Sequence, residues 1–351
     1  MRHITWGDVY QQGWMDVLIE REDMTKRLST IVAGASILAL TLIGCSSGSP
    51  SGSEDSSGSP QGDELTKVVL GILPIAPSAA LQYGIDEGIF EKHGLQVELN
   101  TSNAGAAMLP AVSTGELNLA VGNPLSVITA VDAGLDMRVV TGFSASNPDG
   151  KDVNAVIVRK DSGIDSWSDL AGKTTSVNAL RTQGDLTIME SAEIDGVNPD
   201  DLKFSEMPFP DMPAQLDRRN VDAIWVPEPF MSRALADDNN ELLGYPNQEA
   251  IPGMPTMVSF TSGKFAEENP ETIADFKEAM HEILTDTQND DAVVRDLLPD
   301  FINMDPEESK SIVMEAWNAD VPSAQLEMLA KMADKFGFIE SAPNIADMTV
   351  E

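Results

Sequence analysis

Short apolar runs alternate with amphipathic stretches along most of the chain after residue 64. The apolar runs at 67–73, 96–100 and 117–121 have the length and composition of β-strands. The stretches between them, 78–87 and 106–114, carry apolar residues at helical spacing, and we expect helices there. Strand and helix alternate in this order, which predicts a parallel sheet covered by helices.

The alternation continues through the middle of the chain, and the last third is mainly helical. In the last third, Asn269 and Pro270 are typical of a helix start, and an apolar stripe follows them. Two further helices are predicted to begin at Asp305 and Ser323, the second ending at Gly337. The predictions for the middle are strands at 138–143, 155–158, 174–177, 202–207, 223–226 and 257–261, a helix over 124–133 and a helix that begins at 166.

The first 64 residues follow a different pattern. An apolar run over 28–43 follows Lys26 and Arg27, and it is too short and too rich in Ser and Thr for a spanning helix, so 24–44 is interpreted as a signal peptide. The run ends in Leu-Ile-Gly-Cys45, which resembles a bacterial lipobox, and we expect lipid on Cys45. The alternative, an ordinary buried thiol, is disfavoured by the Ser- and Gly-rich sequence that follows. The predicted location is the extracytoplasmic face of the cell membrane, held by a lipid anchor.

Two flanking segments carry no predicted fold. Residues 1–23 precede Met24, a natural start, and are either an upstream extension from a misplaced start codon or a real cytosolic extension. Residues 45–64 contain the lipidated cysteine and a Ser- and Gly-rich linker, which has almost no apolar side chain to bury and is expected to act as a flexible tether.

The charge of the chain limits its partners. After residue 44 the sequence carries 18 Lys and Arg against 52 Asp and Glu. Such a surface repels nucleic acid and anionic lipid, although adaptation to salt explains the same excess of acids. Cys45 is the single cysteine, so no disulfide framework and no cysteine-based zinc or iron-sulfur site is expected. We expect no metal and no cofactor.

Three motifs occur in order along the folded part: GIFEKHGL at 88–95, GELNLAVGNP at 115–124 and NVDAIWVPEPF at 220–230. Together with the lipobox they resemble the substrate-binding proteins of ABC importers, in the branch that includes sulfonate, nitrate and thiamine-precursor pyrimidine binders. The resemblance implies an α/β fold of the type II periplasmic-binding-protein class, two α/β lobes joined by two hinge crossings with the ligand in the cleft. The expected segments are 65–157 for the first part of lobe I, 158–257 for lobe II, and 258–351 for the return to lobe I with the C-terminal helices.

Ligands of open parallel sheets bind beyond the carboxyl ends of the strands, where loops and helix N-termini converge. The candidate site therefore consists of residues in the loops that follow the predicted strands, with one aromatic at a strand end. The predicted ligand-binding residues are Pro74, Ser78, Asn103, Asn123, Asn178, Arg181, Phe209, Asp211, Trp225 and Glu228.

Most of these residues also have a structural interpretation. Asn123, Asn178 and Asp211 have the residue types of helix N-caps, and a carboxylate at Glu228 favours a helix dipole with or without a ligand. Trp225 lies within a strand and is interpreted first as a core residue, whereas Phe209 suits a pocket wall equally well. Arg181 either binds an anionic group or, as we expect more, pairs with nearby acids.

The candidate loops supply one arginine and two acids, which favours a pyrimidine-like or other nitrogenous or aromatic solute over sulfonate or nitrate. The predicted function is capture of a small organic solute between the lobes and its delivery to the permease and ATPase of an ABC importer, by a monomer that is not an enzyme. His93 and His281 are interpreted as structural, and no HExxH, GxSxG or P-loop motif occurs. Two alternatives stay open: an enzyme of the pyrimidine-synthase type on the same fold, and a solute-sensing lipoprotein without transport.

Overall fold

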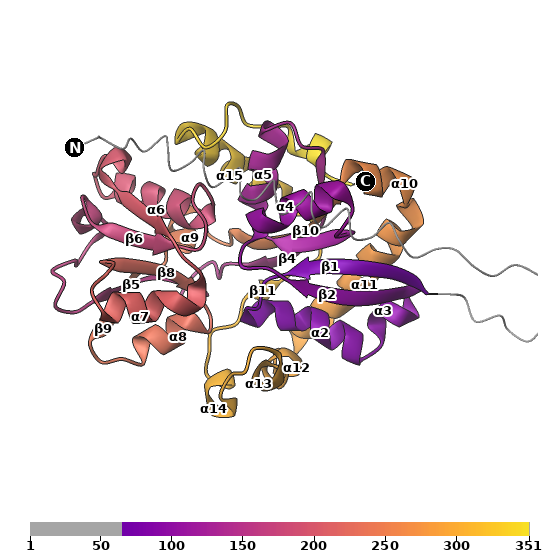
Figure 1. The fold of residues 1–351 in the computed structure, drawn as a ribbon, viewed down its shortest axis with the longest axis horizontal. Coiled ribbons are helices and arrows are strands. Elements are labelled where there is room, and N and C mark those ends of the chain that lie inside the picture. Colours follow the sequence, from indigo (N-terminus) through magenta and orange to yellow (C-terminus); the bar gives the residue numbers. More distant parts are fainter. Residues whose placement is uncertain (1–64, 351) are drawn as a thin grey trace, which may run out of the picture. The chain divides into compact units, whose positions relative to one another are not determined.

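A computed structural model describes residues 65–350 of the chain. The predicted signal peptide, the lipidated Cys45 and the linker lie outside the described residues. The described part contains two sheets, each with its own helices, and these are the two α/β lobes expected from the sequence (Figure 1). Within it, no helix has both the length and the apolar content that a membrane crossing requires.

The first sheet has six strands in the order β11-β4-β10-β3-β1-β2. β1 is parallel to both β2 and β3, whereas β10 is antiparallel to both β3 and β4. The prediction of a wholly parallel sheet is therefore wrong, because a strand that returns from the other lobe enters this sheet in the opposite direction. Its strands are β1 (Thr66–Ile72), β2 (Leu95–Thr101), β3 (Leu119–Gly122), β4 (Met137–Ala145), β10 (Pro255–Ser262) and β11 (Ala316–Trp317).

The second sheet has five strands in the order β7-β6-β8-β5-β9. β6 is parallel to β7 and β8, and β5 is antiparallel to β8 and β9. The sequence prediction missed β9, whose side chains show little alternation between buried and exposed positions. The strands are β5 (Asn154–Arg159), β6 (Thr174–Val177), β7 (Lys203–Glu206), β8 (Ala223–Pro227) and β9 (Asn240–Gly244).

The chain passes from the first sheet to the second between β4 and β5, and it returns between α9 and β10. The two crossings are 146–153 and 251–254. The expected lobe boundaries, after 157 and after 257, fall inside β5 and β10.

Helices cover both sheets (Figure 1). Those with six or more residues are α2 (Ala79–Asp86), α4 (Gly105–Thr114), α5 (Pro124–Asp132), α6 (Gln183–Ile194), α7 (Met212–Asp217), α8 (Phe230–Leu235), α10 (Gly263–Glu268), α11 (Pro270–Asn289) and α15 (Ser323–Lys335). The shorter ones are α3 (Ile89–Lys92), α9 (Pro246–Ala250), α12 (Ala292–Arg295), α13 (Leu298–Phe301), α14 (Pro306–Ser309) and the 3-10 turns η1 (Ala76–Ser78), η2 (Trp167–Leu170), η3 (Pro199–Asp201), η4 (Phe209–Asp211) and η5 (Ile345–Met348).

Helix starts agree with the sequence only in part. Asp305 caps α14 by accepting hydrogen bonds from the Glu307 and Glu308 backbone N–H groups, but this helix is a single turn. The helix predicted from 166 is only the turn η2. Pro270 is the first residue of α11, as predicted, whereas the Asn269 side chain makes no cap and donates instead to the Phe265 carbonyl (3.0 Å).

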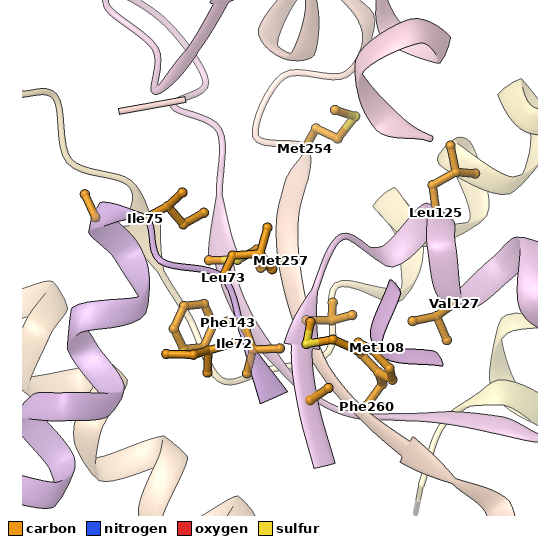
Figure 2. Packing of buried hydrophobic residues seen from close by; sticks show 14 of the residues in the cluster. Ile72, Leu73, Ile75, Met108, Leu125, Val127, Phe143, Met254, Met257 and Phe260 are labelled. Atoms are coloured by element: carbon orange, nitrogen blue, oxygen red, sulfur yellow. The ribbon is translucent and has the colours of Figure 1, made fainter. Parts of the chain in front are cut away.

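The core of the first lobe supports the ends of its strands. The predicted stripe of α11 is buried, and its Phe276 stacks on Phe90 with ring centroids 6.2 Å apart. Burial of such a side chain contributes about 1.5–3 kcal/mol. Figure 2 shows further core residues, among them Ile72, Leu73 and Met257, from strands β1 and β10 and the loop after β1. Apolar packing thus holds the strand ends in place.

Candidate functional site

A cavity with an empty volume of about 460 Å³, part of which is open solvent, lies between the two lobes. The first lobe and the chain's return to it contribute Leu73, Ile75, Asn123, Thr256, Met257 and Glu315. The second lobe contributes Asn154, Asn178, Thr182, Gln183, Phe209, Trp225 and Pro227. A solute in this cavity would contact both lobes at once.

Of the predicted site residues, Asn123, Asn178, Phe209 and Trp225 line this cavity. Asn123 also caps α5, because its Oδ1 accepts from the Ser126 backbone N–H (2.9 Å) and hydroxyl (3.1 Å). The cap uses the side-chain oxygen, so the amide nitrogen is the group that remains for a solute. Asn178 is not a cap: α6 begins five residues later, at Gln183.

Phe209 and Trp225 form an aromatic wall on the second lobe. Their ring centroids lie 5.9 Å apart, and Phe209 stacks on Phe230 at 6.0 Å. A Cβ added to Gly184, in the first turn of α6, would lie 2.7 Å from the indole ring, so only glycine lets the helix begin this close to Trp225. Trp225 is thus both a core residue and a wall of the cavity.

Three other predicted residues, all of the first lobe, do not line this cavity. Pro74 and Asn103 line a smaller neighbouring hollow of about 290 Å³, which shares Phe209 with the main cavity. Ser78 is fully buried in the first lobe.

Asp211 precedes α7 in the position of an N-cap, but its side chain makes no capping hydrogen bond, and the residue is exposed. It does not line the cavity.

Glu228 and Arg181 bind protein groups outside the cavity. The Glu228 carboxylate is buried and accepts from the Ser232 hydroxyl (2.7 Å), the Ser232 N–H (3.1 Å) and the Val313 N–H (3.1 Å). The Arg181 guanidinium forms no salt bridge with an acid of the described residues; it donates to the Gly337 carbonyl (2.6 Å) and lies 5.0 Å from the centre of the Phe338 ring. Both residues join the second lobe to C-terminal segments, which periodicity along the sequence does not reveal.

Five polar cavity residues were not predicted: Asn154, Thr182, Gln183, Thr256 and Glu315. Asn154 and Thr256 are the first and second residues of strands β5 and β10, and Thr182 and Gln183 lie at the start of α6. Glu315 directly precedes the two-residue strand β11. Site residues were predicted only in loops that follow strands. Antiparallel strands bring residues at their N-terminal ends to the cleft, and these residues were therefore missed. The N-cap at Thr182 was detectable, since Asp185 stands three residues later and completes a capping box.

Two buried polar atoms of the cavity residues are uncommitted. Gln183 Oε1 and Trp225 Nε1 have no hydrogen-bond partner among the described residues. Buried polar groups are nearly always paired, because an unpaired one costs about 1–3 kcal/mol. One acceptor and one donor are therefore available to a solute.

Two buried carboxyl groups have raised pKa values: Glu315, which lines the cavity, and Asp185 in the first turn of α6, which does not. Burial raises the pKa of Glu315 to about 7, against the hydrogen bonds from Ser144 and Thr256, and the nearby Asp152 charge raises it further. Burial raises the pKa of Asp185 to about 6, although backbone N–H groups at the start of α6 oppose the shift. Among the described cavity-lining residues there is no Lys, Arg or His, so no lining cation offsets the Glu315 charge.

The two histidines of the described part lie outside the cavity. His93 Nε2 lies 3.0 Å from Glu282, and His281 Nε2 lies 3.3 Å from Asp320. Residues 65–350 contain no group of three or more His, Cys, Asp or Glu side chains that could hold a metal ion.

Comparisons of the sequence with known proteins match one family and one curated relative. The family model described as "NMT1/THI5 like" matches residues 77–290. The ATP-binding protein of nitrate import, NrtC, from Synechocystis is 25% identical over 201 residues, which are 52% of this chain. The chain spans 29% of the length of that relative.

Comparisons of the structure find solved proteins with the same fold at low sequence identity. The periplasmic aliphatic sulphonate-binding protein SsuA from Escherichia coli superposes with a TM-score of 0.66 at 16% identity, covering 81% of this chain and 97% of that one. The periplasmic nitrate-binding protein NrtA from Synechocystis gives 0.69 at 12%, covering 82% and 86%. The predicted periplasmic-binding fold with two lobes is confirmed.

Proposed function

The chain belongs to the NMT1/THI5-like family, as the sequence motifs predicted, and on that premise we propose that it is a solute-binding protein of an ABC importer. It captures a small organic solute between its lobes and delivers it to a permease. The main support for the proposal is the cavity, because residues of both lobes line it. A solute that contacts both lobes binds the closed form better than the open one, and this difference in affinity drives closure.

The solute that suits this cavity carries nitrogen. Its wall offers amides, hydroxyls, a carboxyl group and aromatic rings, with no Lys, Arg or His among the described lining residues. A sulfonate or nitrate would meet the Glu315 carboxyl without a neighbouring cationic side chain. We therefore favour a pyrimidine-like or other nitrogenous aromatic compound over the anions for which SsuA and NrtA are named.

Location and partners complete the proposal. The lipobox-like sequence that ends at Cys45 supports a position on the extracytoplasmic face of the membrane with a lipid anchor on this cysteine, and we expect the protein to act as a monomer. The likeness to an ATP-binding protein of nitrate import supports permease and ATPase subunits as partners. The cavity contains no cysteine or histidine among its described residues, which supports binding without catalysis.

A solute panel tests the proposal. Melting temperatures of the full chain, solubilised in detergent, are measured with pyrimidines, aromatic amines, aromatic acids, sulfonates and nitrate. A nitrogenous aromatic compound is expected to raise the melting temperature by several degrees, because ligand at about 100 times its Kd adds about 2.7 kcal/mol to the unfolding free energy.

A matched pair of variants locates the binding. Asn178→Ala removes a cavity residue and is expected to weaken the effect, whereas Asn198→Ala, which removes the cap of η3 outside the cavity, leaves the solute-induced shift intact. A panel in which no solute changes the melting temperature of the unsubstituted protein would contradict the proposed function.

A further inference from the structure

Glu315 is buried in the wall that separates two hollows. One face of the residue lines the cavity between the lobes, and it also lines a second, polar hollow with an empty volume of about 710 Å³, part of it open solvent. Its Oε2 accepts a hydrogen bond from Thr256 Oγ1 at the start of β10 (2.7 Å), and the Thr256 hydroxyl lies 2.8 Å from Ser144 Oγ on β4. Strand pairing of β11 with β4 fixes the backbone next to it.

Among the described residues, the charged groups that act on Glu315 or line a hollow with it are acids. Asp152 on the first crossing is buried, and it accepts from Ser146 Oγ (2.6 Å) and from two backbone N–H groups. Asp290 and Asp291 line the second hollow, and Asp291 is paired with Arg295 (2.8 Å). Neither hollow has Lys, Arg or His among its described lining residues.

This arrangement is unfavourable for a carboxylate that only supports the fold. A buried acid with hydroxyl partners and no cation costs free energy when it ionises, and burial of polar groups without full compensation is uncommon unless they serve a site. A solute that brings a positive charge into the cavity supplies the missing partner.

We propose that Glu315 determines the charge class of the solute, because its carboxylate receives a protonated or N–H-bearing nitrogen of a solute held between the lobes. The inference rests on the proposed function and deepens it. Gln183 Oε1 and Trp225 Nε1, the two uncommitted atoms of the cavity, suit a solute that offers a second donor and an acceptor.

Binding of such a solute is linked to a proton. Because burial raises the pKa of Glu315 to about 7, the residue is largely protonated below that pH and must lose its proton to pair with a cation. Affinity for a cation therefore rises as pH increases towards about 7 and levels off above it, whereas affinity for an anion falls over the same range.

Two probes of similar size and opposite charge test the inference: 4-aminopyridine, a cation across the range used, and benzenesulfonate. Their affinities for the full chain in detergent are measured by calorimetry at about pH 6 and about pH 8. The unsubstituted protein is expected to bind 4-aminopyridine about tenfold more tightly at the higher pH and in preference to benzenesulfonate.

The variant Glu315→Gln keeps the shape and is expected to bind the cation at least tenfold more weakly at the higher pH, with no remaining pH dependence from this residue. Glu249→Gln is the matched control, since Glu249 also has a pKa raised by burial but lines neither hollow.

Three results would overturn the inference: equal cation affinity in Glu315→Gln, tighter binding of benzenesulfonate than of 4-aminopyridine, or no binding of either probe at millimolar concentration. The proposed function fails separately, only if every solute of the wider panel leaves the melting temperature unchanged.

Discussion

At the scale of single residues, the contact between Gly184 and Trp225 couples a helix to the aromatic wall of the cavity. Gly184→Ala would place a methyl group 2.7 Å from the indole. Overpacking of this kind costs about 1–3 kcal/mol, and here it also shifts a wall of the cavity. We expect lower stability in urea denaturation and weaker solute binding.

A second substitution shows whether the indole is the cause. Trp225→Leu removes the ring that the new methyl group would contact, so Gly184→Ala is expected to cost less in that background. Equal costs in the two backgrounds would mean that the indole contact does not determine the requirement for glycine.

The pH dependence of stability is a second prediction at this scale. Glu315 has a folded-state pKa of about 7, above the value of about 4.5 expected for an unfolded chain. The folded state therefore binds this proton more tightly, and the stability that Glu315 contributes is fully present below about pH 4.5 and is lost as pH rises through about 7. The loss from Glu315 is on the order of 3 kcal/mol.

Asp185, with a pKa raised to about 6, contributes in the same direction. Urea denaturation of the unsubstituted protein and of Glu315→Gln across this range measures the contribution of Glu315. The difference between the two proteins is expected to change with pH; a constant difference would contradict the raised pKa.

Residue types predicted part of the site. Asn123, Asn178 and Phe209 follow strands and Trp225 lies within β8, and the structure brings the four residues to one cavity. Glu315 could not be predicted, because it belongs to a short segment without periodicity and reaches the cavity only through β-pairing with a strand about 170 residues earlier in the chain. Its chemistry depends on burial, which composition does not show.

At the scale of elements, the C-terminal end of α15 joins the lobes outside the cavity. α15 packs against α5 of the first lobe and α6 of the second (Figure 1). Lys335 near its end pairs with Glu190 (2.6 Å) and Glu193 on α6, and Arg181 of the second lobe donates to the Gly337 carbonyl just beyond it. These contacts favour the arrangement of lobes that the structure shows.

Removal of these contacts is expected to open the cleft. Exposed ion pairs contribute about 0–1 kcal/mol each, so the double variant Arg181→Ala, Lys335→Ala should bind the solute several-fold more weakly. Added salt should weaken solute binding by the unsubstituted protein for the same reason. Small-angle scattering is expected to show a larger radius of gyration for the double variant.

Lys331→Ala is the control, because Lys331 lies on the same helix and, among residues 65–350, forms a salt bridge only with Glu327 of that helix. An unchanged affinity in the double variant, or an equal loss in the control, would show that the contacts do not hold the lobes together.

Most strands and helices were predictable because their apolar spacing is regular, as in β1, α4 and α11. Strand direction was not predictable. Alternating strand and helix signals indicate a sheet covered by helices. They do not show that the chain leaves the first lobe, returns from the second and then forms β10 antiparallel to its neighbours.

At the scale of the whole described part, two crossings join the lobes, and a third segment ties them together. The Glu228 carboxylate at the end of β8 accepts from the Val313 N–H, and Arg233 on α8 pairs with Glu308 (3.0 Å). The segment before β11 therefore binds the second lobe, while β11 itself pairs with β4 of the first. Movement of the lobes must bend all three connections.

The place of β10 in the first sheet has a consequence for biogenesis. β10 lies between β3 and β4, so these two strands lack their shared partner until residues 255–262 have been synthesised. The N-terminal lobe cannot complete its sheet while the chain is still emerging from the ribosome up to that point. A polypeptide destined for export across a membrane in an unfolded state would be kept from premature compaction by this order of assembly.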